Sequence, residues 1–407
     1  MRCQVVIIGA GPAGLTLGQM LIRQGIDAVV IEQRSRDYIQ QRVRAGVLEH
    51  VTVDLLEDIG VGDRLSREAL VHNGFYLRFD HRTHHLDFHA DTGRHAYVYG
   101  QAEVVSDLID ARIAADAPLY FSAENVTVGG IDSSRPTVSF VSDGVAQVIE
   151  ADFVAGCDGS HGICATLMPS TTTHFSRTYP FAWLGILAKS TPVTPEGMYS
   201  AHSDGLALHS MRGPDITRQY LQVPVDTDLD DWSDDRIWAE LLRRSASDDG
   251  SELETGPILD RSLAPLRSTM TSPMQYGSMF LLGDAAHTVP PTGAKGLNLA
   301  VSDACVLSYA LGAYYRGGDR HHLDTYSQTA SPRTWQVQVF AAMLTETIHR
   351  LTDDPFDWEL RRARMQRWVT SPAERKALGE VYLGMPFPTP WEFSRTPDRS
   401  PLAHQTT

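Results

Sequence analysis

The chain has 407 residues, a length that usually corresponds to two or three domains and can bury a large core. Hydrophobic residues make up 42% and charged residues 21% of the chain, an ordinary globular composition that excludes a disordered or fibrous protein. The formal net charge of −15 repels phosphate backbones and anionic lipids. We therefore expect neither a nucleic-acid partner nor a membrane partner.

Cysteine usage indicates a reduced, cytoplasmic protein. The four cysteines are scattered, with no CxxC pair, no secretory hydrophobic segment and no apolar run near the length that spans a bilayer. Two groups of possible metal ligands are visible, the cysteines and histidine of residues 157–164 and the histidines of residues 81–89. Neither shows convergent ligands, so we predict no metal. The second group fits the turn and wet face of a half-buried hairpin.

The first 32 residues carry a nucleotide-binding signature. A buried strand, a helix and a second strand are predicted at Gln4–Ile8, Leu15–Arg23 and Ala28–Ile31. A GxGxxG motif joins the first strand to the helix, with glycines at Gly9, Gly11 and Gly14. These glycines allow a tight turn, the approach of a pyrophosphate and close helix–strand packing. Glu32, 23 residues after Gly9, can accept hydrogen bonds from ribose hydroxyls, so the segment predicts dinucleotide binding.

Two further glycine-containing motifs follow predicted strands. The strand Asp152–Ala155 leads into GCDGSHG, with Asp158 and Gly159, and the strand Met279–Leu282 leads into GDAAH, with Asp284. In this order the three motifs resemble those of the flavoprotein monooxygenase family. The resemblance implies that Asp158 and Gly159 lie where FAD and the pyridine nucleotide pass, and that Asp284 binds the ribityl chain of FAD.

The central part of the chain alternates in hydropathy and predicts a sheet. Its strands are expected at Phe181–Ala188, Gly205–Arg212 and Thr217–Val223. One face of the second strand carries Leu208, Ser210 and Arg212, and one face of the third carries Arg218, Tyr220 and Gln222. If the register brings these faces together, the hairpin presents a guanidinium, a hydroxyl and a phenol to one cavity. Residues 225–254 concentrate acidic residues around an expected outer helix near Asp235–Arg244.

A closer resemblance covers residues 1 to about 388. The segments that carry it are Gln40–Glu49, Val98–Glu103, Tyr179–Gly185, Ala264–Ser268 and Pro290–Ala300. They are similar to bacterial 4-hydroxybenzoate 3-monooxygenases, which belong to the class A flavoprotein aromatic monooxygenases. The resemblance implies 3-hydroxylation of 4-hydroxybenzoate, or of a close analogue, with FAD, NAD(P)H and O2 through a flavin C4a-hydroperoxide. It also implies a small aromatic carboxylate as the substrate and a homodimer as the assembly.

The resemblance further implies site residues. The proton of the substrate hydroxyl would pass to solvent through Tyr199, Tyr382 and His72, while Pro291 would place a carbonyl near the ring. The substrate carboxylate and ring would be held by Ser210, Arg212, Tyr220, Thr292, Trp183 and Leu208. Beyond the residues of the three motifs, FAD would be contacted by Arg42, Arg44, Gln101, Arg218, Gly296, Leu297 and Asn298. Lys295 is interpreted as a feature of the flavin loop and not as a catalytic base.

The sequence specifies the electron donor and the ring substituent of the substrate less closely than it specifies the site residues. Arg34 and Tyr38 can contact a 2′-phosphate, which favours NADPH over NADH, and the resemblance places His161 and Arg267 at the pyrophosphate. Gly197, Met198 and Gln219 replace larger or aromatic residues of the family, which predicts a roomier pocket. Hydroxylation of 4-aminobenzoate or 3,4-dihydroxybenzoate therefore stays open. An alternative from another class is a non-catalytic FAD-binding or sensor protein.

The predicted fold is α/β, with a discontinuous Rossmann-like FAD-binding domain, an inserted mixed β-sheet substrate domain and a helical C-terminal region. The FAD-binding domain is assigned to residues 1–70, 98–178 and 268–350. The substrate domain is assigned to residues 71–97 and 179–267, and the helical region to residues 351–388. Residues 389–407 are polar and rich in proline, and we predict a disordered tail.

Overall fold

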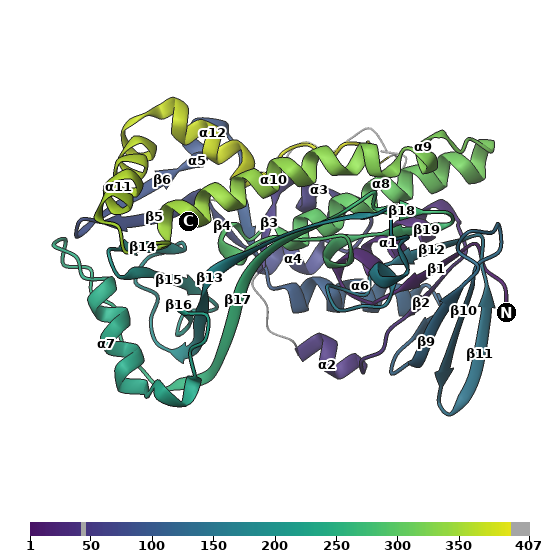
Figure 1. Ribbon diagram of the computed structural model, residues 1–407, viewed down its shortest axis with the longest axis horizontal. Helices are drawn as coiled ribbons and strands as arrows, with labels where there is room; N and C mark the ends of the chain where they lie inside the picture. Colours follow the sequence, from purple (N-terminus) through teal and green to yellow (C-terminus); the bar gives the residue numbers. More distant parts are fainter. Residues whose placement is uncertain (42–45, 392–407) are drawn as a thin grey trace.

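The computed structural model describes residues 1–41 and 46–391 and confirms the α/β class. Figure 1 shows two groups of strands, one at each end of the molecule, with helix α10 lying along both. At one end lies a six-stranded sheet in the order β18-β19-β12-β1-β2-β8, and at the other an eight-stranded sheet in the order β20-β17-β13-β16-β15-β14-β5-β6. The candidate site lies between these sheets.

The six-stranded sheet contains the nucleotide-binding signature. Its strands are β1 (Val5–Ile8), β2 (Ala28–Ile31), β8 (Leu119–Tyr120), β12 (Phe153–Gly156), β18 (Gln275–Tyr276) and β19 (Met279–Leu281). Strand β1 pairs in parallel with β2 on one side and β12 on the other, and β12 pairs in parallel with β19. All four residues of β1 are buried, as the β-branched run predicted, because helices cover a parallel sheet on both faces.

Three helices with buried faces support this sheet: α1 (Pro12–Gln24), α6 (Gln101–Ala114) and α8 (Gly296–Gly317). Helix α8 corrects one prediction, because it is long and apolar enough to cross a membrane by composition alone. However, 83% of its most apolar window is buried inside the protein, as in the core helix of a soluble protein. Two three-stranded sheets flank this region: β9 (Glu124–Gly129), β10 (Thr137–Ser142) and β11 (Val145–Glu150), and β3 (Val47–Glu49), β4 (Leu70–His72) and β7 (Ala96–Val98).

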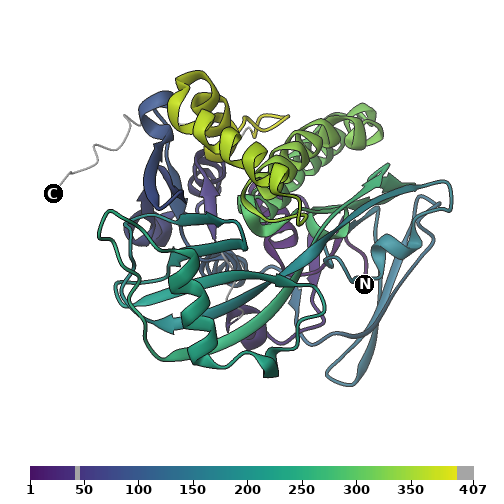
Figure 2. The same ribbon diagram turned by 60° about the vertical axis from the view of Figure 1, so that its left-hand side comes forward.

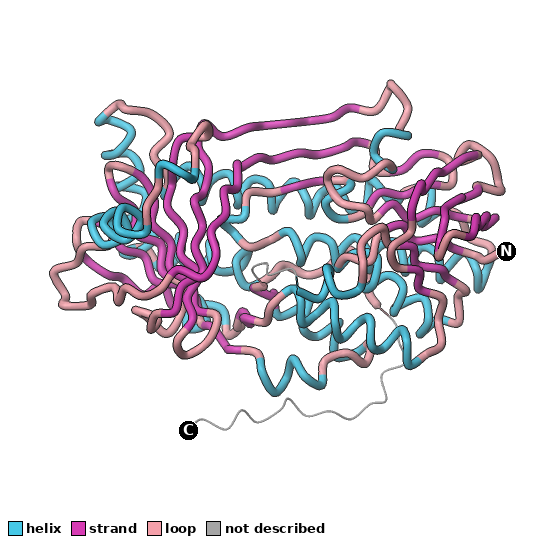
Figure 3. The backbone as a smooth tube through the Cα atoms, turned by 90° about the horizontal axis from the view of Figure 1, so that it is seen from below, coloured by secondary structure: helices cyan, strands magenta, loops and turns pink. Residues whose placement is uncertain are grey.

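The eight-stranded sheet is the larger one. Its strands are β5 (Gly74–Phe79), β6 (Arg82–Asp87), β13 (Thr173–Lys189), β14 (Met198–His202), β15 (Gly205–Met211), β16 (Ile216–Pro224), β17 (Ile258–Ser272) and β20 (His287–Thr288). The three strands predicted in the centre of the chain are confirmed within β13, β15 and β16. The proposed domain boundaries at residues 178 and 268 fall inside β13 and β17, which run side by side towards the other sheet (Figure 3).

Strands β5 and β6 form the predicted hairpin, and Asp80 and His81 turn it with φ angles of 50° and 58°. Phe75, Leu77 and Phe79 point into the core, as their alternation predicted. His85, from the histidine-rich segment, forms a hydrogen bond with the Glu196 carboxylate of a neighbouring loop. Within the described part of the chain, no three histidine, cysteine or acidic side chains are grouped as metal ligands.

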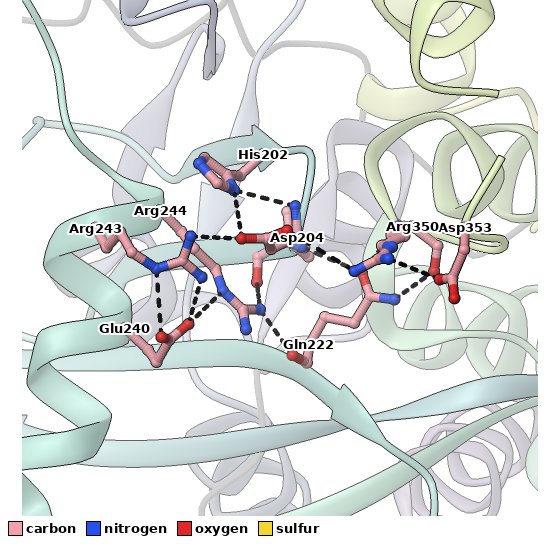
Figure 4. A network of polar contacts seen from close by, with 9 residues as sticks. His202, Asp204, Gln222, Glu240, Arg243, Arg244, Arg350 and Asp353 are labelled. Atoms are coloured by element: carbon pink, nitrogen blue, oxygen red, sulfur yellow. Dashed lines mark hydrogen bonds and ion pairs between the residues drawn. The ribbon is translucent and has the colours of Figure 1, made fainter. Parts of the chain in front are cut away.

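The outer face of the eight-stranded sheet is covered by α7 (Asp234–Arg244), which lies in front of it in Figure 2. Its buried residues Ile237, Trp238 and Leu241 pack on the sheet while its acidic residues remain outside, as predicted for an outer helix. Polar contacts fasten this helix to the central strands β15 and β16 and to the turn before β15 (Figure 4). Arg244 binds Glu240 at 3.0 Å and the Gln222 carbonyl at 2.7 Å, which fixes the outer side of the strands that carry the site.

The C-terminal region is helical, as predicted. Its helices are α10 (Tyr326–Ile348), α11 (Pro355–Thr370) and α12 (Pro372–Leu383), and the shorter helices of the chain are α2 (Arg36–Gln41), α3 (His50–Asp58), α4 (Asp63–Glu68), α5 (Phe88–Thr92) and α9 (His321–Asp324). The predicted tail starts too early, because Thr389 is buried and the Trp391 indole donates to Asp58 at 2.7 Å. An aromatic contact between Phe387 and Trp391 holds this segment on the core. Residues 392–407 lie outside the described residues.

Candidate active site

A cleft of about 440 Å³ opens at the carboxyl ends of β1, β2 and β12. Ligands of open α/β sheets bind at such ends, where loops leave the strands. Twelve of the predicted cofactor residues line it: Gly9, Gly11, Glu32, Arg34, Tyr38, Gln101, Asp158, Gly159, His161, Asp284, Gly296 and Leu297. The three short motifs and the family resemblance thus pointed to residues that line one cleft.

The GxGxxG loop has the geometry that each glycine predicts. Gly9 has φ = 109°, and a Cβ there would lie 2.3 Å from the Cys157 carbonyl oxygen. A Cβ on Gly14 would lie 2.0 Å from the Gly9 oxygen, so only glycine allows α1 to pack this closely. A Cβ on Gly11 would meet nothing within 4 Å, because this position faces the cleft. The N-terminus of α1 is thereby open to a phosphate group.

The two acidic residues of the cleft are held in different ways. Glu32 accepts from the backbone N–H groups of Ala10 at 2.8 Å and Arg34 at 2.7 Å, which fixes its carboxylate at the end of β2. Asp158 accepts from the Cys164 N–H at 2.9 Å through Oδ2. Its Oδ1 is buried and has no partner among the residues that the structure describes. Burial raises the pKa of Asp158, so a hydroxyl or N–H of a bound nucleotide would satisfy an otherwise costly group.

The second part of the site is one face of the eight-stranded sheet. Leu208 lies opposite Tyr199 on one side and Tyr220 on the other, so the three side chains form a row across β14, β15 and β16. Because side chains alternate along a strand, Ser210 and Arg212 point to the same face as Leu208. Trp183 of β13 joins this row, with its ring 4.8 Å from that of Tyr220. The register that the sequence left open is therefore the one that gathers these groups.

Four residues after Leu208, just past the end of β15, lies a guanidinium suited to a carboxylate. Arg212 Nε is buried and lacks a hydrogen-bond partner within the described ranges, while Nη1 reaches only the neighbouring Met211 carbonyl at 3.3 Å. Burial lowers the pKa of Arg212, and an interaction with the Tyr220 hydroxyl opposes this effect. An anion bound here would satisfy both the charge and the free N–H, and a carboxylate matches the planar fork.

At the β14 side of the row lies Tyr199, whose hydroxyl donates to the Thr292 carbonyl oxygen at 2.6 Å. Tyr199 is buried, and burial raises its pKa, so the phenol stays protonated. Thr292 belongs to the loop before α8, whose first residues line the nucleotide cleft. One side chain thus connects the two parts of the site.

Comparisons with known proteins agree with this geometry. The FAD binding domain family matches residues 2–341. The p-hydroxybenzoate hydroxylase of Acinetobacter baylyi is 43% identical over 390 residues, which cover 95% of this chain and 96% of that protein. The chain belongs to the flavoprotein aromatic monooxygenases. It is an enzyme that uses FAD, with NAD(P)H and O2 as the reactants of this class.

More distant relatives share the architecture of this monooxygenase. Rifampicin monooxygenase of Rhodococcus hoagii is 25% identical over 393 residues, which cover 92% of this chain and 80% of that protein. The solved structure of p-nitrophenol 4-monooxygenase from Pseudomonas putida has a TM-score of 0.80 at 18% identity, and the match covers 94% of this chain and 98% of that one. This last similarity shows the fold alone.

A hydrogen-bond chain behind the site of the monooxygenase was missed by sequence analysis. Trp183 Nε1–H donates to His349 Nε2 at 2.7 Å, and His349 Nδ1–H donates to the Thr345 carbonyl at 2.9 Å. The Thr345 hydroxyl bonds the Thr292 hydroxyl at 2.9 Å. Burial lowers the pKa of His349 to about 3, so its ring stays neutral and can accept from the indole. Helix α10 therefore positions the pocket wall and the flavin loop together.

The flavin loop rests on a second group of buried charges that the motifs did not reveal. Lys295 Nζ donates to Glu49 at 2.9 Å and to the Tyr382 carbonyl at 2.6 Å, and Arg333 pairs with the other Glu49 oxygen. Asn298 donates to the Val47 carbonyl at 2.9 Å, so it joins α8 to β3. These contacts agree with the interpretation of Lys295 as a loop feature, since its ammonium is fully occupied inside the protein.

Several predicted site residues lie apart from the cleft. Arg218 is held by Asp260 at 3.0 Å and by Ser262 at 2.7 Å, and Arg267 lies exposed on β17. The Pro291 carbonyl accepts from the Ala294 N–H at 2.9 Å, whereas Thr292 supplies the carbonyl that Tyr199 reaches. Arg42 and Arg44 lie outside the described residues.

Two residues of the predicted proton relay, Tyr199 and Tyr382, lie against one aromatic ring. Phe75 contacts the ring of Tyr199 at 4.9 Å and the ring of Tyr382 at 5.2 Å. Burial raises the pKa of Tyr382, and the neighbouring Tyr199 raises it further. His72, at the end of β4, is also buried. The structure thus brings Tyr199 and Tyr382 together from distant parts of the sequence, and the role of the three residues as a relay stays a prediction.

Two of the three substitutions behind the prediction of a roomier pocket, Met198 and Gln219, do not face the pocket. Met198 lies opposite His209, and Gln219 bonds the His209 side chain, so both point to the outer face of the sheet. The pocket face carries Tyr199 and Tyr220 instead. Because the period along a strand is two residues, a change at 198 or 219 alters the packing behind the sheet and leaves the ring pocket unchanged.

Proposed function

We propose that the enzyme hydroxylates 4-hydroxybenzoate at the 3-position, giving 3,4-dihydroxybenzoate, with NADPH and O2. The observation that carries this proposal is one sheet face that holds both the buried Arg212 Nε, which has no partner among the described residues, and the buried Tyr199 hydroxyl. A para-substituted benzoate has an anion and a hydroxyl on one ring, which fits a guanidinium and a phenol on the same face. The relative named p-hydroxybenzoate hydroxylase supports the assignment.

The proposed carboxylate site comprises Arg212, Ser210 and Tyr220. The guanidinium supplies a charged fork, and the two hydroxyls complete the hydrogen bonds of the carboxylate oxygens. Trp183 and Leu208 pack against the ring faces, and Pro291 and Thr292 cover its edge next to the cofactor. Holding the ring in this way fixes which carbon faces the flavin, so the position of attack follows from binding.

The proposed role of Tyr199 is to receive the proton of the substrate hydroxyl. When substrate is bound, its hydroxyl replaces the Thr292 carbonyl as the partner of Tyr199, and Tyr382 and His72 carry the proton onward. Removing this proton makes the carbon beside the oxygen more nucleophilic, which favours attack on an electrophilic oxygen. Bound FAD supplies that oxygen atom after reduction by NADPH and reaction with O2.

The residues of the cleft fit FAD. The open Gly11 position accommodates the diphosphate, and the unpartnered Asp158 Oδ1 and the fixed Glu32 carboxylate can accept from hydroxyls. Arg34 and Tyr38, whose side chains stack at 5.3 Å, are proposed to select NADPH, with His161 and Arg267 at its pyrophosphate. The division into a discontinuous FAD-binding domain and a substrate domain, a homodimeric assembly and a cytoplasmic location are further proposals that rest on the family resemblance.

The test is a steady-state screen of purified holoenzyme with 4-hydroxybenzoate, 4-aminobenzoate, 3,4-dihydroxybenzoate and benzoate, each with NADPH and with NADH. We expect 4-hydroxybenzoate to stimulate NADPH oxidation and O2 uptake. The amount of 3,4-dihydroxybenzoate formed should nearly equal the amount of NADPH consumed. NADPH oxidation that releases only hydrogen peroxide with every benzoate would refute the proposal. Bound flavin without turnover would instead support the sensor alternative.

A further inference from the structure

The proton relay of the proposed reaction is incomplete at His72. Only 4% of this residue is exposed, and its Nε2 has no hydrogen-bond partner among residues 1–41 and 46–391. Burial lowers the pKa of His72, while the charge of Glu196 opposes this shift. A proton that reaches His72 therefore still has to cross a layer of protein before it meets water.

Glu196 occupies this layer. Its Oε1 accepts from the Asn73 N–H, next to His72 in sequence, at 2.6 Å. The position is set by the backbone, because the Gly197 carbonyl accepts from the Tyr76 N–H at 2.8 Å and extends the pairing of β14 with β5. A buried carboxylate is costly without a charged or hydrogen-bonding partner. Glu196 has such a partner on its inner side, the Asn73 N–H, and a second partner on its outer side.

The outer partner is His85. Its Nε2 lies 2.9 Å from Glu196 Oε2, and 31% of its side chain is exposed, against 9% for the Glu196 side chain. The ring stacks on Tyr76 at 4.5 Å, which holds it over the carboxylate. Because the imidazole ring is partly exposed, water can reach it. The groups thus form a series from the buried His72 to the surface.

We propose that Glu196 and His85 form the exit of the proton relay, so that the phenolic proton of the substrate leaves the protein at the His85 ring. This inference rests on the proposed function. The proton on His72 moves to the Glu196 carboxylate, then to His85, and from there to water or buffer. No electron moves, and each group returns to its starting state after one proton has passed.

Other titratable groups face Glu196 and must be considered in any pH profile. They are His72 from β4, Tyr76 from β5 and Tyr382 from α12, all of which feel its charge. His95, which immediately precedes β7, approaches through a 2.9 Å contact with the Asn73 side chain. Because Glu196 also influences Tyr382, an equilibrium measurement would mix electrostatic and relay effects, and a rate is the better observable.

The experiment measures how fast bound 4-hydroxybenzoate loses its phenolic proton in oxidised holoenzyme, by stopped-flow absorbance of the phenolate. His85→Ala should slow this step about tenfold or more, and added imidazole should restore it in proportion to its concentration. Glu196→Gln should slow it without rescue, because that group is buried. His85→Gln tests the same step if the alanine variant does not fold, since glutamine can bond Glu196 but cannot carry a proton.

The matched control is His84→Ala, which removes a neighbouring histidine that lies against Phe79 on the opposite face of β6. It should leave the rate unchanged and imidazole-independent. A wild-type rate in both His85 variants, or a slow rate that imidazole does not restore in a folded His85→Ala protein, would overturn the inference. If the wild-type enzyme forms no phenolate, both the proposed function and the proton exit through Glu196 and His85 are refuted. If only the variants form phenolate slowly, the result concerns the proton exit alone.

Discussion

Replacing Arg212 with lysine tests the carboxylate site. Arg212 Nε is the buried donor that lacks a partner in the described part of the chain, and an ammonium cannot reproduce a planar fork at this position. The change keeps the charge and removes about one charge-assisted hydrogen bond, a loss of about 1.5–3 kcal/mol. At about 1.4 kcal/mol per tenfold, the dissociation constant of 4-hydroxybenzoate should rise about 10- to 150-fold.

The assay is titration of the oxidised holoenzyme with 4-hydroxybenzoate, followed by the change in flavin absorbance. A parallel titration with 4-hydroxybenzyl alcohol, which lacks the carboxylate, separates anion binding from pocket damage. Arg261→Lys is the matched control, because that arginine of the same sheet contacts Asp234 and the Trp232 carbonyl on the outer side. An unchanged dissociation constant for 4-hydroxybenzoate, or an equal loss for the alcohol, would refute the reasoning.

Three further predictions follow from the geometry. Tyr199→Phe should keep substrate binding and flavin reduction but divert most NADPH to hydrogen peroxide, measured as the ratio of product to NADPH; a wild-type ratio would contradict the relay. Gly14→Ala should abolish folding or FAD binding, since its Cβ would lie 2.0 Å from the Gly9 oxygen. Gly11→Ala should fold but bind FAD more weakly. Denaturant unfolding and titration with flavin measure the two effects. Because burial lowers the pKa of His349 to about 3, the unfolded chain binds its proton first, so stability should fall by up to about 1.4 kcal/mol per unit as pH drops below about 6.5. In a folded His349→Gln variant, the denaturant midpoint should fall less steeply with decreasing pH than in the wild type. Equal pH slopes for the two proteins would contradict this role of His349.

The cofactor cleft could be predicted from the sequence because its signals are local. Gly9, Gly14 and Glu32 lie within one strand–helix–strand unit, and each residue type has one steric or hydrogen-bonding reason to occur there. The face that carries Ser210 and Arg212 was also predictable, since alternation along a strand needs no knowledge of the partner strand. The same rule applied to Met198 would have placed it behind the sheet, opposite to Tyr199.

The support of the site could not be predicted in this way. His349 and Thr345 act through contacts with Trp183 and Thr292, which lie 166 and 53 positions away in sequence. Nothing in the local pattern of a long buried helix marks such residues as ligands of an indole or a hydroxyl. The pairing of Glu49 with Lys295 and Arg333 depends likewise on how α8 and α10 pack against β3, which is a property of the complete fold.

The two long strands β13 and β17 limit how this enzyme can be divided. At about 3.3 Å per residue, strands of 17 and 15 residues extend for about 50 Å, and both contribute hydrogen bonds at each of their ends. A cut at residue 178 or 268 divides paired strands and leaves backbone N–H and C=O groups without partners on both fragments. Chimaeras with related enzymes should therefore exchange segments at surface loops, such as residues 225–231, which lie outside the named strands.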